Sequence, residues 1–194
     1  MNSTELLIQL YEIGCIQFGK FTMVSGLSSP IYIDLRRVMA KPSLLKQVAQ
    51  AYAGLIHTLH FDLLAAVPYA ALTIATAVSL AIDKPLIYPR KRIKTHGARR
   101  EVEGIFSPRD KSIVIEDLVT KGGSVLGAIE VLEHVGLTVT DVAVLIDREQ
   151  GGRERLDNRG YELHACFTLS QLVKVLHQER RISTEEVTMV LNTL

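Results

Sequence analysis

The sequence predicts an α/β fold in which a central, mostly parallel sheet is flanked by helices. Short apolar segments rich in branched residues alternate along the chain with longer segments whose apolar residues recur at helical spacing. Such alternation is typical of βαβ units, which bring successive strands into a parallel sheet. The chain has 194 residues, of which 47% are hydrophobic, so it is long enough to bury such a sheet within one domain, 1–194.

The predicted elements follow one another without an internal repeat or a linker. Leu6, Leu7 and Leu10 recur at helical spacing, which predicts an amphipathic helix over the first dozen residues. The segment 31–35 alternates as a strand after a turn-like stretch, so we expect an antiparallel or edge strand there. The alternating part comprises helix 43–59, strand 63–67, helix 69–82, strand 86–88, strand 112–115, helix 123–135, strand 142–146 and strand 161–167, followed by helices 170–180 and 183–192.

The composition argues against several classes of protein. The formal net charge of +1 disfavours a nucleic-acid partner held by overall charge. Cys15 and Cys166 lie far apart in apolar surroundings, without the spacing of a disulfide framework or a metal site. The first residues lack the features of a signal peptide and no apolar run reaches the length of a membrane span, so we expect a cytoplasmic protein without a membrane partner. The histidines outside the segment 90–104 show neither metal-ligand spacing nor companion acids, and we assign them to helices, strands or the surface: His57, His60, His134, His164 and His177.

The segment 112–124 joins a buried strand to two carboxylates and a glycine-containing turn. Glu116 and Asp117 follow the branched apolar residues, at the carboxyl end of a predicted parallel strand, where open α/β sheets bind ligands. Carboxylates there are suited to accept hydrogen bonds from vicinal sugar hydroxyls. The turn 120–124 offers backbone N–H groups at the start of a helix, as a phosphate site requires. The alternative is an acidic strand end before an ordinary helix; the spacing matches neither a Walker loop nor the dinucleotide fingerprint.

The segment 90–104 is the main compositional anomaly, with six cations and two anions. A solvated surface loop or a nucleic-acid patch is one interpretation. The other is a lid, because the segment leaves the end of a predicted parallel strand, at the same edge of the sheet as the acidic pair.

Arg148 directly follows the predicted strand 142–146. A guanidinium can hold a carboxylate or a ring carbonyl through two parallel N–H bonds, which lysine cannot reproduce. A salt bridge within the turn, to Asp147 or Glu149, is the alternative.

The acidic pair and the turn after it together resemble the motif with which type I phosphoribosyltransferases bind phosphoribosyl pyrophosphate (PRPP). In that family the acids hold the ribose 2′- and 3′-hydroxyls and a Thr-x-Gly-x-Ser loop holds the 5′-phosphate. The resemblance implies the type I phosphoribosyltransferase fold, with a small N-terminal hood region. It implies a PRPP site made of Glu116, Asp117, Leu118, Val119, Thr120, Lys121, Gly122, Gly123 and Ser124.

The segment 90–97 resembles the catalytic loop of orotate phosphoribosyltransferases, part of which reaches across a dimer interface. Displacing pyrophosphate builds positive charge on the ribose and negative charge on the leaving group, so fixed cations at the pyrophosphate favour the reaction. The resemblance implies a homodimer with shared active sites, in which PRPP also binds Arg90, Lys91, Lys94 and His96. It gives catalytic roles to Asp117, Lys94 and His96, the last as a donor to the departing oxygen.

Three more segments resemble the base-binding parts of the same enzymes: 25–32, 67–72 and 147–152. Their amino-acid sequences are similar to the transferase half of bifunctional UMP synthases. We expect no fused decarboxylase half in this chain. The resemblance implies that orotate binds Tyr32, Ile33, Tyr69, Thr120 and Arg148. It implies conversion of orotate and PRPP to orotidine 5′-monophosphate and pyrophosphate, in pyrimidine synthesis. The Mg²⁺ required would be held mainly by the substrate, so no dedicated metal-ligand cluster is expected.

Four positions depart from the family pattern. Val24 replaces an active-site lysine, Arg92 an acid of the loop, Ala66 a glycine and Ala70 a polar residue. These departures keep two alternatives open: a PRPP-binding paralogue with altered base specificity, and a regulator without catalysis.

Overall fold

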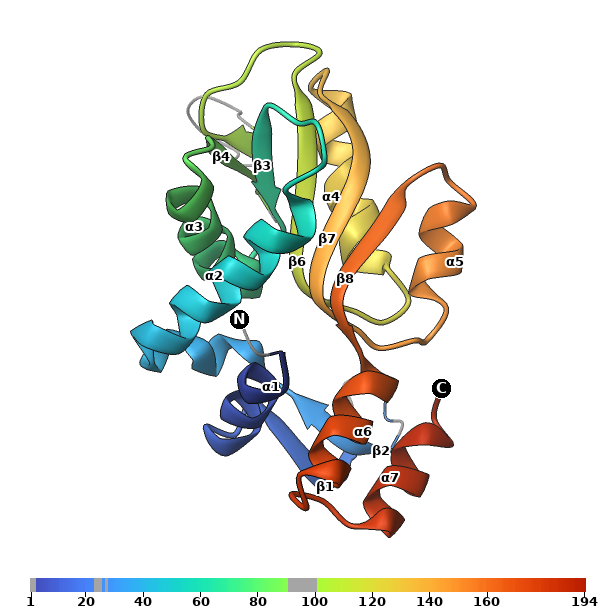
Figure 1. Cartoon of the computed structure of the whole chain (residues 1–194). Helices are drawn as coiled ribbons and strands as arrows, with labels where there is room; N and C mark the ends of the chain where they lie inside the picture. Colours follow the sequence, from blue (N-terminus) through green and yellow to red (C-terminus); the bar gives the residue numbers. More distant parts are fainter. Residues whose placement is uncertain (1–2, 23–25, 27, 91–100) are drawn as a thin grey trace.

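A computed structural model describes residues 3–22, 26, 28–90 and 101–194, and these residues contain a six-stranded sheet of order β5-β4-β3-β6-β7-β8 (Figure 1). β3, β4, β6, β7 and β8 pair in parallel, whereas β5 pairs antiparallel to β4. The carboxyl ends of the five parallel strands therefore meet at one edge of the sheet. The strands are β3 (Leu63–Ala66), β4 (Leu86–Pro89), β5 (Val102–Glu103), β6 (Lys111–Val119), β7 (Thr138–Asp147) and β8 (Glu162–Thr168).

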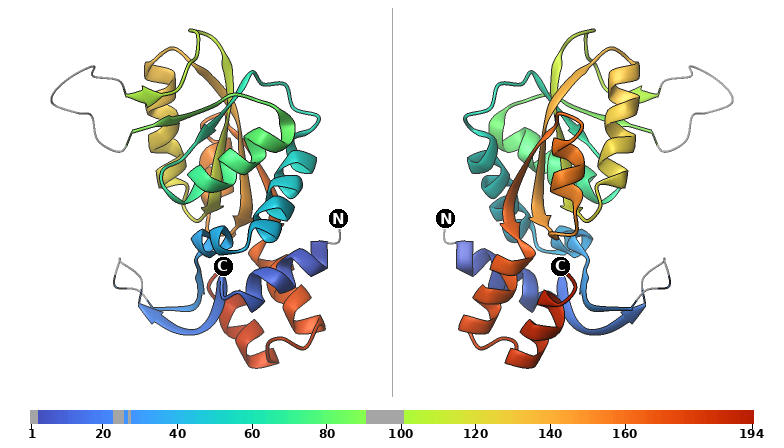
Figure 2. Two further views of the ribbon diagram at one scale, coloured as in Figure 1. Left: turned by 90° about the vertical axis from the view of Figure 1, so that its left-hand side faces the viewer. Right: turned by 90° about the vertical axis from the view of Figure 1, so that its right-hand side faces the viewer.

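Helices cover both faces of the sheet, because successive residues of its strands point to opposite sides. In β6, Ile113 and Ile115 belong to one buried cluster and Val114 to the other. The first cluster includes residues of α2 (Pro42–Ile56) and α3 (Ala70–Ile82), and the second includes residues of α4 (Gly123–His134) and α5 (Gly152–Asp157). Figure 2 shows α4 on the opposite side of the sheet from α2 and α3. No helix in the described ranges has both the length and the apolar character that a membrane crossing needs.

A smaller unit lies beyond the carboxyl edge of the sheet (Figure 1). It contains the antiparallel pair β1 (Ile16–Thr22) and β2 (Ser28–Ile33), with α1 (Ser3–Glu12), α6 (Leu169–Gln178) and α7 (Thr184–Leu191) packed around it. Leu6, Leu7 and Leu10 of α1 are buried against it, as their helical spacing predicts. The hood is therefore built from both ends of the described chain, and not from the N-terminal region alone.

The parallel core agrees with the prediction, and the differences lie at strand ends and in short elements. β6 continues to Val119, so the acidic pair lies inside the strand and not after it. The strand predicted at 31–35 is β2, which ends at Ile33; Leu35 begins the 3₁₀ helix η1 (Leu35–Ala40), because the Asp34 side chain accepts the N–H of Arg36. The sequence analysis missed β1, β5, α5 and η1. These elements are short or carry weak apolar periodicity, so the pattern that reveals a buried strand or a long helix is absent.

Candidate functional site

The acidic pair lies near the carboxyl end of β6, the central strand that pairs with both β3 and β7. Glu116 is 5% exposed. Its side chain accepts hydrogen bonds from Ser124 Oγ at 3.1 Å and from the Asp117 N–H at 3.2 Å. The Asp117 carboxylate accepts the N–H of Leu118 at 2.9 Å. The two carboxylates are thus held by the strand itself and by the first turn of α4.

Burial raises the pKa of both carboxyl groups. The pKa of Glu116 rises to about 9, first because of burial and second because of the neighbouring Asp117 charge. Burial also raises the pKa of Asp117, although the hydrogen bonds to its carboxylate and the positive charge of Arg36 oppose this. Two adjacent carboxylates in a poorly hydrated site cannot both ionise easily. A partner that supplies hydrogen-bond donors or positive charge would lower both pKa values, and perturbed groups of this kind are typical of functional sites.

Arg36 is a neighbour of Asp117 that the sequence analysis missed. Its guanidinium binds both oxygens of Asp34, at 2.6 Å and 2.9 Å, and its charge acts on the pKa of Asp117. The 3₁₀ helix η1 therefore places the ion pair of Asp34 and Arg36 within electrostatic range of Asp117. No sequence pattern indicated it, because Asp34 and Arg36 look like an ordinary charged turn.

The predicted phosphate turn joins β6 to α4. Gly122 caps the helix with φ +73°, in the left-handed region that favours glycine, and α4 begins at the next residue. Such a left-handed to helical sequence of residues directs consecutive N–H groups to one point, where the helix dipole also favours an anion. Leu118 and Val119 pack their side chains against or within the two buried clusters, so only their backbone is available to a ligand.

Gly152 supports this turn from the neighbouring loop, a role the sequence analysis also missed. A Cβ atom at Gly152 would lie 2.4 Å from the carbonyl oxygen of Thr120 and 2.8 Å from Val119 Cγ2. The loop after β7 therefore touches the phosphate turn, and only glycine permits the approach. The Arg155 guanidinium adds a hydrogen bond to the Lys121 carbonyl at 3.2 Å.

Arg148 is buried beside this turn, and its side chain has no ion-pair partner within the described ranges. It is 4% exposed, and its Nε has no hydrogen-bond partner among the described residues. The alternative of a salt bridge within the turn is wrong, since Asp147 pairs instead with Arg153 at 3.2 Å and Glu149 accepts the N–H of Ser170 at 2.7 Å. Burial lowers the pKa of Arg148. A buried, unpaired guanidinium is costly and calls for a ligand.

A cavity of about 830 Å³ joins the phosphate turn to Arg148. It lies between the carboxyl edge of the sheet and the hood, and its volume suits a small-molecule ligand. Among its lining residues are Ser28 and Ser29 of β2, Thr120, Gly123 and Ser124 of the phosphate turn, and Arg148.

The other predicted base-binding residues lie on the hood and on the turn after β3. Tyr32 is half-buried on β2, with its ring 5.5 Å from that of Phe21. The side chain of Ile33 belongs to the buried cluster, so Ile33 can offer only its backbone to a ligand. Tyr69 is 67% exposed and precedes α3, and its peptide bond with Pro68 is cis. Of the departures from the family pattern, Ala66 is buried at the end of β3 and Ala70 begins α3.

Arg90 lies close to the phosphate turn. It lines a cavity of about 280 Å³ together with Ser124, Val67 and Pro68. Its guanidinium is paired with Glu103 of β5. The other positions singled out from the sequence lie outside the described residues: Lys91, Arg92, Lys94, His96 and Val24.

Two histidines have carboxylate neighbours that the sequence did not reveal. His164 Nε2 lies 2.7 Å from Asp141 Oδ1 and its Nδ1 lies 3.9 Å from Glu162, and His134 Nδ1 lies 2.8 Å from Glu101. The expectation of no companion acids is therefore wrong for both: Asp141 and Glu101 are distant from these histidines in the sequence, whereas Glu162 is only two residues from His164. Asp141, Glu162 and His164 form a group that could hold a metal ion. It lies toward the amino ends of β7 and β8, away from the acidic pair.

Comparisons with known proteins agree with this geometry. Residues 35–164 match the family model described as phosphoribosyl transferase domain. The chain is 43% identical over 187 residues to the uridine 5′-monophosphate synthase of Bos taurus, covering 95% of this chain and 39% of that protein. It is 37% identical over 179 residues to the orotate phosphoribosyltransferase of Chlamydia caviae, covering 91% and 87%.

A solved structure shows the same relation. The UMP synthase of Leishmania donovani superposes with a TM-score of 0.91 at 38% identity, covering 99% of this chain and 42% of that one. The chain thus spans about two fifths of the length of these two synthases, and most of the shorter Chlamydia protein.

Proposed function

The chain belongs to the phosphoribosyl transferase domain family, and from this premise we propose that it transfers the phosphoribosyl group of PRPP to orotate, in pyrimidine biosynthesis. One observation carries the choice of orotate: Arg148 is buried and unpaired at the cavity that also holds the phosphate turn. A guanidinium has donors only, so it suits a base with a carboxylate or ring carbonyls better than a purine. The relatives named above as orotate phosphoribosyltransferase and UMP synthase support the same choice.

In the proposed reaction the PRPP 5′-phosphate binds the N–H groups of the turn 120–124, and the ribose hydroxyls bind Glu116 and Asp117. The bond from the anomeric carbon to the pyrophosphate oxygen breaks, and a new bond forms to a ring nitrogen of orotate, whose proton passes to the departing pyrophosphate or to water. The ribose becomes positively charged on the way, and a nearby carboxylate such as Asp117 stabilises that charge.

The negative charge that develops on the leaving pyrophosphate requires cations beside it. Arg90 is placed to contribute, since it shares a cavity with Ser124 of the phosphate turn. To do so its guanidinium must exchange Glu103 for the pyrophosphate. We propose Lys91, Lys94 and His96 as further pyrophosphate ligands on the strength of the motif in which they stand.

We propose Mg²⁺ as the cofactor, bound to pyrophosphate and ribose oxygens of PRPP. The acidic pair fits such a role, because the raised pKa values of Glu116 and Asp117 mean that positive charge nearby would favour their ionised forms. Mg²⁺ bound to PRPP would neutralise negative charge on the leaving pyrophosphate. We also propose a cytoplasmic location, which suits two free, buried or half-buried thiols, Cys15 and Cys166, whose pKa burial raises to about 12.

The assay follows the loss of orotate absorbance in the presence of PRPP and Mg²⁺, with uracil, hypoxanthine and adenine as competing bases. Turnover of orotate alone is the expected result. Faster turnover of another base would mean altered specificity. Intact PRPP binding without turnover of any base would identify a regulator.

We further propose a homodimer in which Lys94 and His96 of one subunit complete the site that contains Asp117 of its partner. Lys94→Ala and Asp117→Ala homodimers should each be nearly inactive, because every site then has a defect. After equal mixing and random exchange, half the dimers are mixed and each has one intact site, so about a quarter of all sites should recover. Demonstrated exchange without recovery would place each complete site within one chain.

A further inference from the structure

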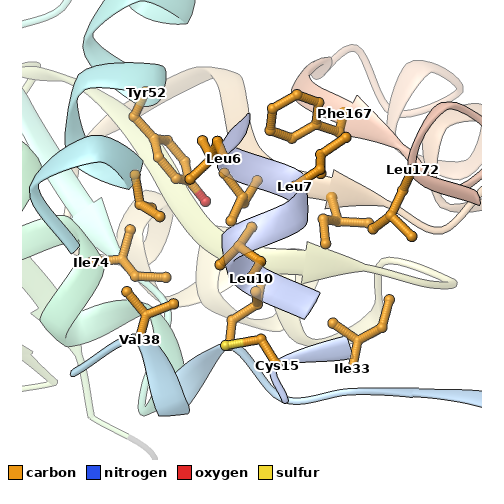
Figure 3. Close-up of a cluster of buried hydrophobic side chains, with 14 of the residues drawn as sticks. Leu6, Leu7, Leu10, Cys15, Ile33, Val38, Tyr52, Ile74, Phe167 and Leu172 are labelled. Atoms are coloured by element: carbon orange, nitrogen blue, oxygen red, sulfur yellow. The ribbon is translucent and has the colours of Figure 1, made fainter. Parts of the chain in front are cut away.

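The side chain of Tyr52 extends from α2 to the backbone of the acidic pair. It lies on α2, is 0% exposed, and projects into the cluster of apolar side chains between α2 and the sheet (Figure 3). Its hydroxyl donates a hydrogen bond of 2.6 Å to the carbonyl oxygen of Glu116 on β6. Burial raises the pKa of this hydroxyl, and the backbone N–H of Leu145 on β7, which faces it, opposes that rise. One buried side chain thus meets both of the strands whose ends carry the site.

The hydroxyl sits at a step where one residue pair is missing, although the register of the two strands is the same on either side of it. The register pairs Glu116 with Val144 and, two residues later, Leu118 with Ile146. Between them, within the described ladder, no pair joins Asp117 to Leu145. A polar group inserted into an otherwise apolar cluster at this step is expected only where backbone groups need it.

Backbone N–H groups at this step hold the carboxylates. The Asp117 N–H donates to the Glu116 carboxylate at 3.2 Å, and the Leu118 N–H donates to the Asp117 carboxylate at 2.9 Å. The placement of this stretch of backbone therefore orients the two carboxylates before a ligand arrives.

We propose that Tyr52 is a positioning residue for the acidic pair: its hydroxyl fixes the backbone of β6 at Glu116, beside β7, and so orients the carboxylates of Glu116 and Asp117. The functional consequence rests on the proposed function, since these acids are there the ribose ligands. Tyr52 touches no substrate, so its removal should act through the placement of the carboxylates alone.

The test is Tyr52→Phe, which keeps the buried ring and removes only the hydroxyl. The matched control is Tyr11→Phe, because the Tyr11 hydroxyl also donates to a backbone carbonyl, that of Arg181 at 3.2 Å, but in the hood. Tyr52→Phe should weaken PRPP binding and lower kcat/KM for PRPP about tenfold or more, with KM for orotate changed less than twofold. Tyr11→Phe should leave both within twofold, even where the two variants lose similar thermal stability.

PRPP affinity is measured by calorimetry as well as by turnover, so the positioning role is tested even if the protein turns over no orotate. A folded Tyr52→Phe protein with PRPP affinity and kcat within twofold of the unmodified protein would overturn the proposal. Should that variant not fold, NMR of the unmodified protein decides: the buried Tyr52 hydroxyl proton must show a contact with the Leu145 amide proton. Its absence would also overturn the proposal.

Discussion

Replacing Arg148 with methionine should make the free protein more stable and the site inactive. Arg148 is buried, and its Nε is an orphan donor among the described residues. One unsatisfied buried donor costs about 1–3 kcal/mol, more if it is charged. Methionine fills much of the same space without a polar group, so Arg148→Met should raise the free energy of unfolding by about 1–3 kcal/mol. For a chain of this size that is an increase in Tm of about 2–12 °C.

Arg148→Met should also abolish the preference for orotate over other bases. Two hydrogen bonds to a charged group contribute about 1.5–3 kcal/mol each, so losing a bidentate contact should weaken orotate binding by roughly a hundredfold or more. PRPP binding should change little, because the phosphate turn is built from backbone groups. Calorimetric titration with each substrate separates the two effects. Arg148→Lys keeps the charge but loses the two parallel N–H donors, so it should also weaken the binding of orotate more than that of PRPP.

Arg153→Met is the matched control, since Arg153 lies in the same loop region but is paired. It binds Asp147, which is 2% exposed, and the carbonyl of Leu163. Its removal leaves a buried carboxylate without its cation, so it should lower the free energy of unfolding by about 1–3 kcal/mol. Thermal unfolding at one fixed protein concentration compares the variants. A destabilised Arg148→Met protein, or one that still binds orotate normally, would refute the reasoning.

Three other predictions follow from the acidic pair and the phosphate turn. Asp117→Asn should lower kcat/KM by roughly tens to a thousandfold, equivalent to about 2–4 kcal/mol of lost charge stabilisation, and near-normal turnover would exclude the role. Gly152→Ala should weaken PRPP binding, because the added Cβ would lie 2.4 Å from the Thr120 carbonyl oxygen. Gly54→Ala is the control, because this position on α2 faces open space. It should leave PRPP binding unchanged and raise the free energy of unfolding by about 0.5–1 kcal/mol. The free energy of unfolding should fall between about pH 5 and pH 9, because the unfolded chain releases the Glu116 proton near the ordinary glutamate pKa of 4.5 while the folded protein keeps it to about 9. Denaturant titrations at pH 6 and pH 9 measure this slope, which Glu116→Gln should reduce.

The sequence predicted those parts of the site that one continuous segment carries. The acids and the phosphate turn follow a branched apolar run, and the ends of parallel strands share an edge, so the segment 112–124 and Arg148 could be assigned to the same edge of the sheet from their strand positions. The parallel strands themselves were found because their residues are apolar on both faces, as burial between two helical layers requires.

The residues that hold the site in shape could not be predicted in this way. Tyr52 looks like one more apolar residue of an amphipathic helix, and Gly152 like part of a flexible turn, because their partners lie 64 and about 32 residues away. Arg36 and the Asp141 carboxylate beside His164 were missed for the same reason, since the residues that they meet are also distant in the sequence. A local pattern reveals an element or a motif, but not which distant backbone atom a side chain will meet.

In the part of the chain that the structure describes, the free protein buries ionisable groups of both signs that form no ion pair with one another. The acids have raised pKa values and Arg148 a lowered one, each because burial disfavours the ionised form. These groups cannot relieve one another, since the acidic pair is fixed by its own backbone and Arg148 lacks an ion-pair partner within the described chain. Ribose hydroxyls and a bound cation would stabilise the ionised acids, and the carboxylate of the base would pair with Arg148. The stability that burial costs the free protein would therefore be recovered on binding. It would favour the proposed pair of substrates, which brings donors to the acids and an anion to the arginine.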